Sequence, residues 1–442
     1  MKKRLLNDYG MLLALLVLCL LFSGLTYTEQ HPTGSAAARS VASVLAERDL
    51  ASGANVFLVG RDQKQDIEFT QALSKLMSEK GVNVMATING EPSEARKVIR
   101  RFVEEGASLD AILGTDVTAK WLAFEGLEKD FPSLGNPAVL GPKSYKWPNF
   151  LKRDNLLNIS SQISVIAILA IGMTVVIITA GIDLSVGSLI ALAAVLSAYC
   201  MKNFFGAEEA GFGGMVLSSC VGILACGFVG LFTGWMVTRF KVPPFIVTLG
   251  MMLVASGLSY IVAGGLSIHQ IPDSFVWLGR GADLVGIPNS VVLMLILYVC
   301  AHVMMSKTKV GRYIYAVGGN AEAARLSGVP VKRVLLFAYC LSGLLAGLGG
   351  IVMASQLQSG SATYGLMYEL YTIAAVVVGG ASLAGGEGRM FGTLIGAFII
   401  AVIWNGMNLT NVEPYTQKVV LGFVILGAVL LDRLKRGGWK SD

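Results

Sequence analysis

The residues best suited to act on a partner lie in one polar segment, 307–333, between two long apolar runs. Its one acid is Glu322, and its six basic residues are Lys307, Lys309, Arg312, Arg325, Lys332 and Arg333. Short loops rich in Lys and Arg beside membrane spans stay on the cytoplasmic side, because they are not translocated easily. The segment therefore predicts the orientation of every apolar run around it.

A short helix is predicted inside this segment, over residues 320–328. Asn320 is suited to cap its first turn, the Ala and Leu residues favour helix, and Gly328 can end it before Pro330. A capped helix with small side chains offers a compact surface for docking a partner. The alternative interpretation is a solvated basic loop.

Composition indicates the class of the chain. Of its 442 residues, 54% are hydrophobic and only 14% are charged, and the mean hydropathy is +0.64. These values lie outside the range of ordinary soluble domains and indicate a polytopic membrane protein. The net charge of +6 follows from basic residues at the cytoplasmic margins, so no nucleic-acid partner is expected.

Cysteine and histidine usage predicts neither disulfides nor a metal site. The three histidines are far apart, and no cofactor or catalytic residue is expected. The cysteines all fall in apolar runs, where each behaves as a small hydrophobic residue: Cys19, Cys200, Cys220, Cys226, Cys300 and Cys340.

The N-terminal 29 residues are predicted to form a transmembrane anchor. A basic start is followed by an apolar run over 11–27, which is just long enough to cross a bilayer. A cleaved signal peptide is the alternative. The small residues that would suit cleavage, 35–39, lie well beyond the run, so an uncleaved anchor is favoured.

Residues 30–147 read as a soluble α/β domain outside the membrane. Apolar runs at 54–60, 82–88 and 110–115 are expected as strands, and helical spacing is seen at 69–81, 92–106 and 118–131. Strands that alternate with helices predict a parallel sheet covered on both faces.

Ten membrane spans are predicted, with both termini and the tail 435–442 in the cytoplasm. Apart from the domain 30–147, the basic residues gather on the loops that this topology places inside, and the short outside loops carry few of them. The spans are 11–27, 157–180, 184–201, 215–238, 242–265, 287–306, 334–357, 370–383, 390–409 and 415–431.

Asp183 and Ser185 stand between the second and third spans, in the sequence GIDLSVGS. A carboxylate at the bilayer centre typically costs about 2.5–3.5 kcal/mol on insertion scales, and less near an edge. Asp183 either caps the following helix, by accepting amide hydrogens of its first turn, or acts directly in transport.

Four stretches resemble the membrane permease subunits of bacterial ATP-binding-cassette (ABC) sugar importers of the ribose, xylose and galactose type. They are AIGMTVVIITAGIDLSVGSLIAL, VPPFIVTLG, GRYIYAVGGNAEAARLSGV and YELYTIAAVVVGGASLAGGEGRMFGTLIGAFIIAVIWNGMNL, in unbroken order across residues 148–434. The resemblance implies a bacterial inner-membrane permease, paired as a homodimer in contact with membrane lipid, with a solute path at the subunit interface. It also implies a periplasmic sugar-binding protein and a separate ATPase subunit, since no GxxxxGK[ST] motif occurs here.

The resemblance also implies roles for individual residues. The helix over 320–328 would rest on the ATPase. The residues expected to couple to it are Gly311, Arg312, Asn320, Glu322, Ala324, Arg325, Leu326 and Gly328. Those expected along the solute path are Asp183, Ser185, Glu369 and Asn405.

The chain departs from this pattern between its first span and Pro148, where such permeases have a short link. Residues 30–147 are instead similar to one lobe of periplasmic sugar-binding proteins. Since those proteins close two lobes over a sugar, a lone lobe should bind sugar weakly. An unrelated α/β insert is the alternative.

The sequence leaves two other function classes open. A membrane-bound sugar receptor would sense ligand through its outer domain, but should carry an output domain, and about ten residues follow the last span. A secondary transporter is disfavoured by the scarcity of charges within the spans. The small, neutral residues of the spans would suit a pentose, a hexose or a related polyol.

Overall fold

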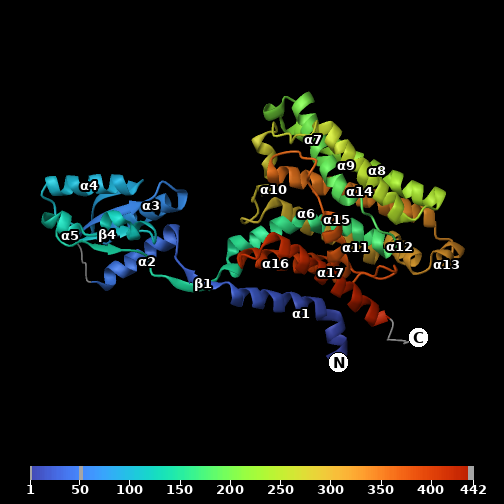
Figure 1. Cartoon of the computed structure of the whole chain (residues 1–442), viewed down its shortest axis with the longest axis horizontal. Helices are drawn as coiled ribbons and strands as arrows, with labels where there is room; N and C mark the ends of the chain where they lie inside the picture. The colour runs from blue at the N-terminus through green and yellow to red at the C-terminus, as the bar shows by residue number, and fades with distance from the viewer. Residues whose placement is uncertain (1, 49–52, 437–442) are drawn as a thin grey trace. The chain divides into compact units, whose positions relative to one another are not determined.

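The computed structural model describes residues 2–48 and 53–436, and the chain forms two compact units (Figure 1). Unit 1 joins the chain up to Thr26 with the chain from Asn149 onward, and unit 2 comprises Tyr27–Pro148. Unit 2 thus interrupts unit 1 at a single point.

Unit 1 is a bundle of helices. It contains α1 (Lys2–Leu25), α6 (Arg153–Ile178), α7 (Val186–Phe204), α8 (Phe212–Phe240), α9 (Pro244–Ala263), α10 (Trp277–Arg280), α11 (Asn289–Lys307), α12 (Lys309–Gly319), α13 (Ala321–Leu326), α14 (Val331–Leu357), α15 (Tyr368–Val378), α16 (Met390–Leu409) and α17 (Pro414–Arg436), with the 3₁₀ turns η4 (Asn149–Leu151), η5 (Ala207–Glu209) and η6 (Asp273–Val276). The core of the bundle is formed mainly by α6, α7 and α14.

Among the described residues, seven helices are long and apolar enough to cross a membrane: α6, α7, α8, α9, α11, α14 and α16. Buried residues make up 89% of the apolar window in α6 but only 22% of that in α9, so α6 is central and α9 peripheral. This confirms a polytopic helical protein.

The predicted span 370–383 is shorter in the structure. Its helix, α15, has 11 residues and measures about 16 Å, roughly half of a hydrocarbon core of about 30 Å. It ends at Gly379 and Gly380, and Gly380 adopts a left-handed conformation with φ of 82° that stops the helix.

Unit 2 is built on a parallel sheet of order β3-β2-β4-β5. The strands are β2 (Asn55–Gly60), β3 (Asn83–Asn89), β4 (Ala111–Gly114) and β5 (Ala138–Leu140), and the helices are α2 (Gly34–Glu47), α3 (Lys64–Glu79), α4 (Pro92–Glu104) and α5 (Leu127–Asp130), with η1 (Thr118–Lys120), η2 (Leu122–Phe124) and η3 (Pro132–Leu134). Apolar side chains of α2 and α3 cover one face, and those of α4, η2 and α5 cover the other.

A two-stranded antiparallel ribbon closes unit 2 where the chain enters and leaves it. It pairs β1 (Tyr27–Gln30) with β6 (Tyr145–Pro148), and Tyr27 stands directly opposite Pro148. The two ends of the unit are therefore adjacent.

The prediction of a third helix in this unit, over residues 118–131, is wrong. The segment breaks into η1, η2 and α5, because Trp121 is extended and Gly126 is left-handed with φ of 71°. The sequence patterns also missed α2 and β5, whereas β2, β3, β4, α3 and α4 lie where strands and helices were expected.

Candidate coupling surface and solute path

The helix expected over residues 320–328 is present as α13, and both of its ends are fixed by the predicted residues. The Asn320 side-chain oxygen accepts hydrogen bonds from the amides of Glu322 (3.0 Å) and Ala323 (2.9 Å). At the other end Gly328 is left-handed with φ of 85°, and its amide donates to the Arg325 carbonyl at 3.0 Å. The capped-helix prediction is confirmed.

The exposed surface of α13 carries the long side chains of Glu322, Arg325 and Leu326, beside the small Ala321 and Ala323. Leu326 is 78% exposed. Arg325 forms an ion pair with Glu322 one turn earlier, with Nε to Oε2 at 3.2 Å, and this hydrogen bond lowers the pKa of the Glu322 carboxyl. Ala324 is only 6% exposed and belongs to the core, so it is not part of the docking surface itself. α13 therefore presents an ion pair beside the exposed apolar side chain of Leu326.

α12 connects this surface to the spans. The Tyr315 hydroxyl donates to the Gly388 carbonyl at 2.7 Å, and the Thr308 hydroxyl oxygen accepts the Gly311 amide at 3.3 Å. Arg312 is exposed, whereas Gly311 is buried against the backbone of Met305, where a Cβ would overlap. Gly311 therefore shapes the turn from α11 into α12 and offers no exposed docking surface.

The end of α12 packs backbone to backbone on the end of α6. A Cβ on Gly318 would overlap the Ile178 carbonyl oxygen, and that same oxygen accepts the Gly386 amide at 2.8 Å. One carbonyl thus joins α6, α12 and the loop after α15. The neighbouring Gly319 has nothing within 4 Å of a Cβ position.

Asp183 is 1% exposed and links the α6–α7 turn to α14. One carboxylate oxygen accepts the Ser185 amide (3.0 Å) and hydroxyl (2.6 Å), and the other accepts the Ser342 hydroxyl (2.8 Å). The predicted cap is wrong in detail: α7 begins at Val186, and Asp183 binds the residue before the helix instead of first-turn amides. The hydrogen bond between Asp183 and Ser342 joins residues 159 positions apart in sequence.

The chain between α14 and α15 is not helical and runs along α7. In this segment, 358–367, a Cβ on Gly360 would lie 2.6 Å from the Ala194 carbonyl oxygen, and one on Gly365 would overlap the Gly187 carbonyl oxygen. Because Gly360 meets a later turn of α7 and Gly365 meets its first turn, the segment descends antiparallel to α7.

Glu369, in the first turn of α15, is the third predicted path residue at this place. Its carboxylate lies against Gly187, where a Cβ would overlap it. Asp183, Ser185 and Glu369 are thus brought together around the start of α7. The N-termini of α7 and α15 meet there.

Asn405 lies elsewhere. It exchanges two amide hydrogen bonds with Asn155, at 2.9 and 3.1 Å, and Asn155 also donates to the Phe150 carbonyl at 2.8 Å. The pair clamps the last turns of α16 to the first turn of α6. Asn405 therefore does not gather with the other three path residues.

Sequence reasoning missed several partners of these residues. Ser342 and Tyr339 gave no motif because each is an isolated polar residue in an apolar helix, and Asn155 gave none because it lies among the polar residues that begin α6. Tyr339 is fully buried, and its hydroxyl has no hydrogen-bond partner within the described chain. A polar residue in an otherwise apolar span was the one available signal.

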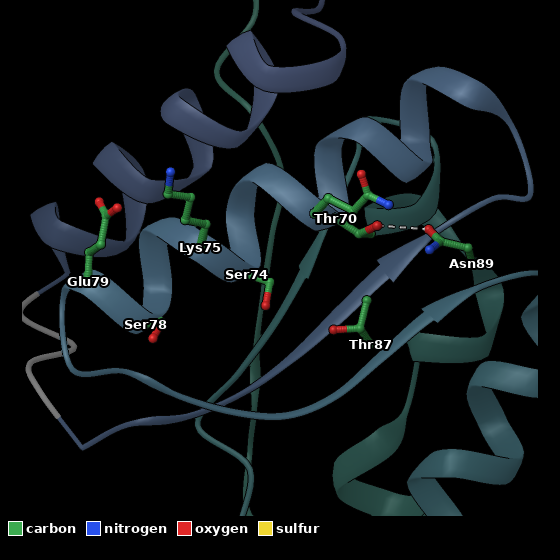
Figure 2. Close-up of a pocket in the computed structure, with 8 residues that line it drawn as sticks. Thr70, Ser74, Lys75, Ser78, Glu79, Thr87 and Asn89 are labelled. Atoms are coloured by element: carbon green, nitrogen blue, oxygen red, sulfur yellow. Dashed lines mark hydrogen bonds between the residues drawn. The ribbon is translucent and has the colours of Figure 1, made fainter.

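Unit 2 has a polar groove of about 650 Å³ between α3 and the edge strand β3 (Figure 2). Its lining contains hydroxyls, carboxamides, one ammonium and one carboxylate, from Thr70, Gln71, Ser74, Lys75, Ser78, Glu79, Thr87 and Asn89. The Thr70 hydroxyl donates to the Asn89 side chain at 3.0 Å, which ties the helix to the end of the strand.

The carboxyl end of β2 in the same unit carries a charge pair. Arg61 Nε donates to the Asp66 carboxylate at 2.8 Å, and this side-chain hydrogen bond raises the pKa of Arg61. The backbone amide of Arg61 donates to the same carboxylate at 3.0 Å. In open parallel sheets, ligands bind beyond the carboxyl ends of strands.

A bundle with seven helices long and apolar enough to cross a bilayer defines a polytopic integral membrane protein. The sequence profile described as "Branched-chain amino acid transport system / permease component" matches residues 155–429, and the chain belongs to this family. The match begins after unit 2.

Curated relatives are named as sugar import permeases. The chain is 45% identical over 294 residues to the ribose import permease protein RbsC of Escherichia coli K12, covering 65% of this chain and 88% of that protein. It is 42% identical to the RbsC protein of Bacillus subtilis (72% and 96% covered), and 35% identical to the D-allose transport system permease protein AlsC of Escherichia coli K12 (67% and 88%). No solved structure matches the chain. The resemblance to permeases of ABC sugar importers is thus confirmed.

Proposed function

We propose that this chain is the membrane permease subunit of an ATP-driven importer that carries a sugar into a bacterial cell. The observation that carries this proposal is the 45% identity spread over 88% of a ribose import permease. The family description refers to branched-chain amino acids, but the similar relatives are named for ribose, allose and galactose. A pentose or hexose is therefore the solute we propose.

The permease lies in the inner membrane, crosses it about ten times and keeps both termini in the cytoplasm. Seven helices meet the length and hydropathy that a span requires. The other crossings are made by α1, by α17, and by α15 together with the non-helical chain 358–367 that precedes it. The basic residues around α12 and α13 support a cytoplasmic position for those helices. Unit 2 then lies in the periplasm.

An ATPase subunit docks on α13 and powers transport, and two copies of the permease form a homodimer around the solute path. The support is the exposed Glu322–Arg325 pair with Leu326 beside it, on a helix that α12 ties to α6. Gly311 and Gly318 give this linkage its close packing. Movement of the ATPase would thereby reach the ends of the spans.

The solute path passes the start of α7, where Asp183, Ser185 and Glu369 gather. Asn405 holds α16 to α6 near the point where the chain returns from unit 2, and so supports the path indirectly.

Unit 2 acts as a tethered lobe that helps a separate periplasmic sugar-binding protein deliver its sugar. The polar groove along α3 and β3 suits hydrogen bonding to another hydrophilic surface. A domain on a short tether has an effective concentration on the order of millimolar, so weak affinity suffices.

Uptake by intact cells tests the proposal. The chain is produced with its ATPase and binding protein in a bacterium that lacks its own ribose, allose and galactose permeases. Uptake of labelled sugar above the background of cells lacking this chain is expected for at least one of the three. Uptake of labelled leucine but of none of the sugars would contradict the proposal.

A further inference from the structure

The broken crossing between α14 and α15 lies deep in the bundle. The Ser342 hydroxyl, which binds Asp183 beside the start of α7, belongs to a residue eleven positions after Val331, about 16 Å along α14. Residues 360–365 run along α7 toward that depth, with Gly360 at a later turn of α7 and Gly365 at its first turn, and both α7 and α14 qualify as membrane spans. A stretch of non-helical backbone therefore stands at membrane depth.

Hydrogen bonds to the chain after α9 hold the first part of this stretch. The Ser267 hydroxyl donates to Ser361 at 2.9 Å, Ser361 and Thr363 share a hydrogen bond of 3.0 Å, and the Ile268 and Gly360 backbones exchange bonds of 2.8 and 2.9 Å. Its ends are strained, since Gln358 and Met367 adopt positive φ angles of 49° and 71°. Strain in side-chain-bearing residues is typical of functional segments.

The outer side of the stretch is exposed. Thr363 and Leu366 are exposed, Leu366 by 76%, and the Glu369 carboxylate that follows is half-buried. Irregular backbone cannot face lipid, because each unsatisfied amide or carbonyl there costs several kcal/mol. The exposed side must face a water-filled path or another protein surface.

We propose that residues 360–369 are the solute-recognition element of the permease, with the Thr363 hydroxyl and the Glu369 carboxylate hydrogen-bonding a neutral polyol as it passes. A carboxylate accepts hydrogen bonds from two neighbouring hydroxyls, and a threonine hydroxyl both donates and accepts. The proposal rests on the proposed sugar-import function for its ligand. That the segment lines a water-filled path rests on geometry alone.

Cysteine labelling tests the path directly. Thr363→Cys and the control Leu295→Cys, on the exposed side of α11, are compared in membrane vesicles with a charged, water-soluble thiosulfonate. Thr363→Cys is expected to react at least about tenfold faster, because the reactive thiolate forms only where water reaches. Equal, slow labelling of both would overturn the proposal. The unsubstituted chain gives the background of the six native cysteines.

Protection by solute tests the ligand. Vesicles that also contain the ATPase are given sugar-loaded binding protein, with D-ribose and D-galactose as the sugars used. Slower labelling of Thr363→Cys with at least one of them, compared with unloaded binding protein, is the expected result. Labelling that neither sugar slows would refute the assignment of Thr363 to solute contact.

Transport kinetics provide a second readout. Thr363→Val and Glu369→Gln keep side-chain shape but remove a hydroxyl or a charge, and each is expected to lower the maximal uptake rate about tenfold. The half-saturating concentration should stay unchanged, because the binding protein sets it, and Thr363→Ser should restore the rate. The control Thr238→Val removes a hydroxyl that bonds within α8 and should leave uptake intact.

Kinetics and labelling separate two kinds of failure. If the unsubstituted chain takes up no sugar, the proposed function fails, while the labelling of Thr363→Cys still reports on the path. If uptake is normal in Thr363→Val and in Glu369→Gln, the recognition element is refuted and the importer is not.

Discussion

The amide of Phe150 donates a hydrogen bond of 3.1 Å to the hydroxyl of Thr26, although 124 positions separate them in sequence. The Asn149 amide also donates to the Thr26 carbonyl at 2.9 Å, and the Phe22 and Phe150 rings stack 6.2 Å apart. Unit 1 is therefore closed at the point where the chain leaves it and returns.

Deletion of unit 2 should leave this closure intact. Replacing residues 27–148 with a short Gly/Ser turn is expected to give a folded, membrane-inserted permease, because few buried contacts of unit 1 are lost at such a junction. Uptake at low sugar concentration should fall, since the tethered lobe is gone. Uptake is measured across sugar concentrations.

The deletion has a clear contrary outcome. A full rate with unchanged sugar dependence would show that unit 2 is a passenger. Phe150→Ala in the full-length chain is the complementary variant. It removes the ring stacking that closes unit 1 but keeps unit 2.

Membrane orientation predicts opposite labelling of two exposed serines. Ser93→Cys, on α4 of unit 2, should react with an impermeant maleimide added outside spheroplasts. Ser327→Cys, at the end of α13, should react only after the membrane is opened. The reverse pattern would invert the topology.

Charge reversal on α13 should uncouple transport from ATP hydrolysis. Arg325→Glu places two acids side by side on the surface proposed for the ATPase, so ATP-driven uptake is expected to fall to background while the protein remains inserted. Uptake and membrane content are measured in the same cells.

A swapped pair distinguishes docking from helix stability. Glu322→Arg with Arg325→Glu keeps an ion pair within α13 but reverses its direction. Loss of uptake in both variants supports docking, whereas recovery in the swapped pair would mean that only the internal pair matters.

Adjacent glycines at the end of α12 offer a test with a built-in control. Gly318→Ala pushes a Cβ into the Ile178 carbonyl oxygen, so α12 must shift and the protein is expected to lose about 1–3 kcal/mol of stability, with uptake reduced. Gly319→Ala adds a Cβ into open space and should behave like the unsubstituted chain. Thermal unfolding in detergent and uptake are the measurements. Equal behaviour of the two variants would contradict the packing described here.

Local sequence signals predicted the elements that depend on local chemistry. Asn320 and Gly328 delimit α13 because capping and left-handed glycine are properties of neighbouring residues. Apolar runs likewise located the seven helices that qualify as spans.

Local sequence signals could not predict the contacts between segments that are distant in sequence. The break before α15 depends on Gly360 and Gly365 meeting α7, and the role of Asp183 depends on Ser342 of α14. The resemblance implied that Asn405 lies on the solute path, and no local signal indicated that its side chain pairs with Asn155, 250 positions away. A polar residue in an apolar run shows that it needs a partner, but only the fold shows which one.

Reconstituted transport tests the central claim most directly. Proteoliposomes are prepared with this chain, its ATPase and its binding protein, and uptake of labelled ribose, allose and galactose is followed with enclosed ATP. At least one sugar is expected to accumulate with ATP and none with a non-hydrolysable analogue. Accumulation that is the same with the analogue, or none of any sugar with ATP, would contradict an ATP-driven sugar permease.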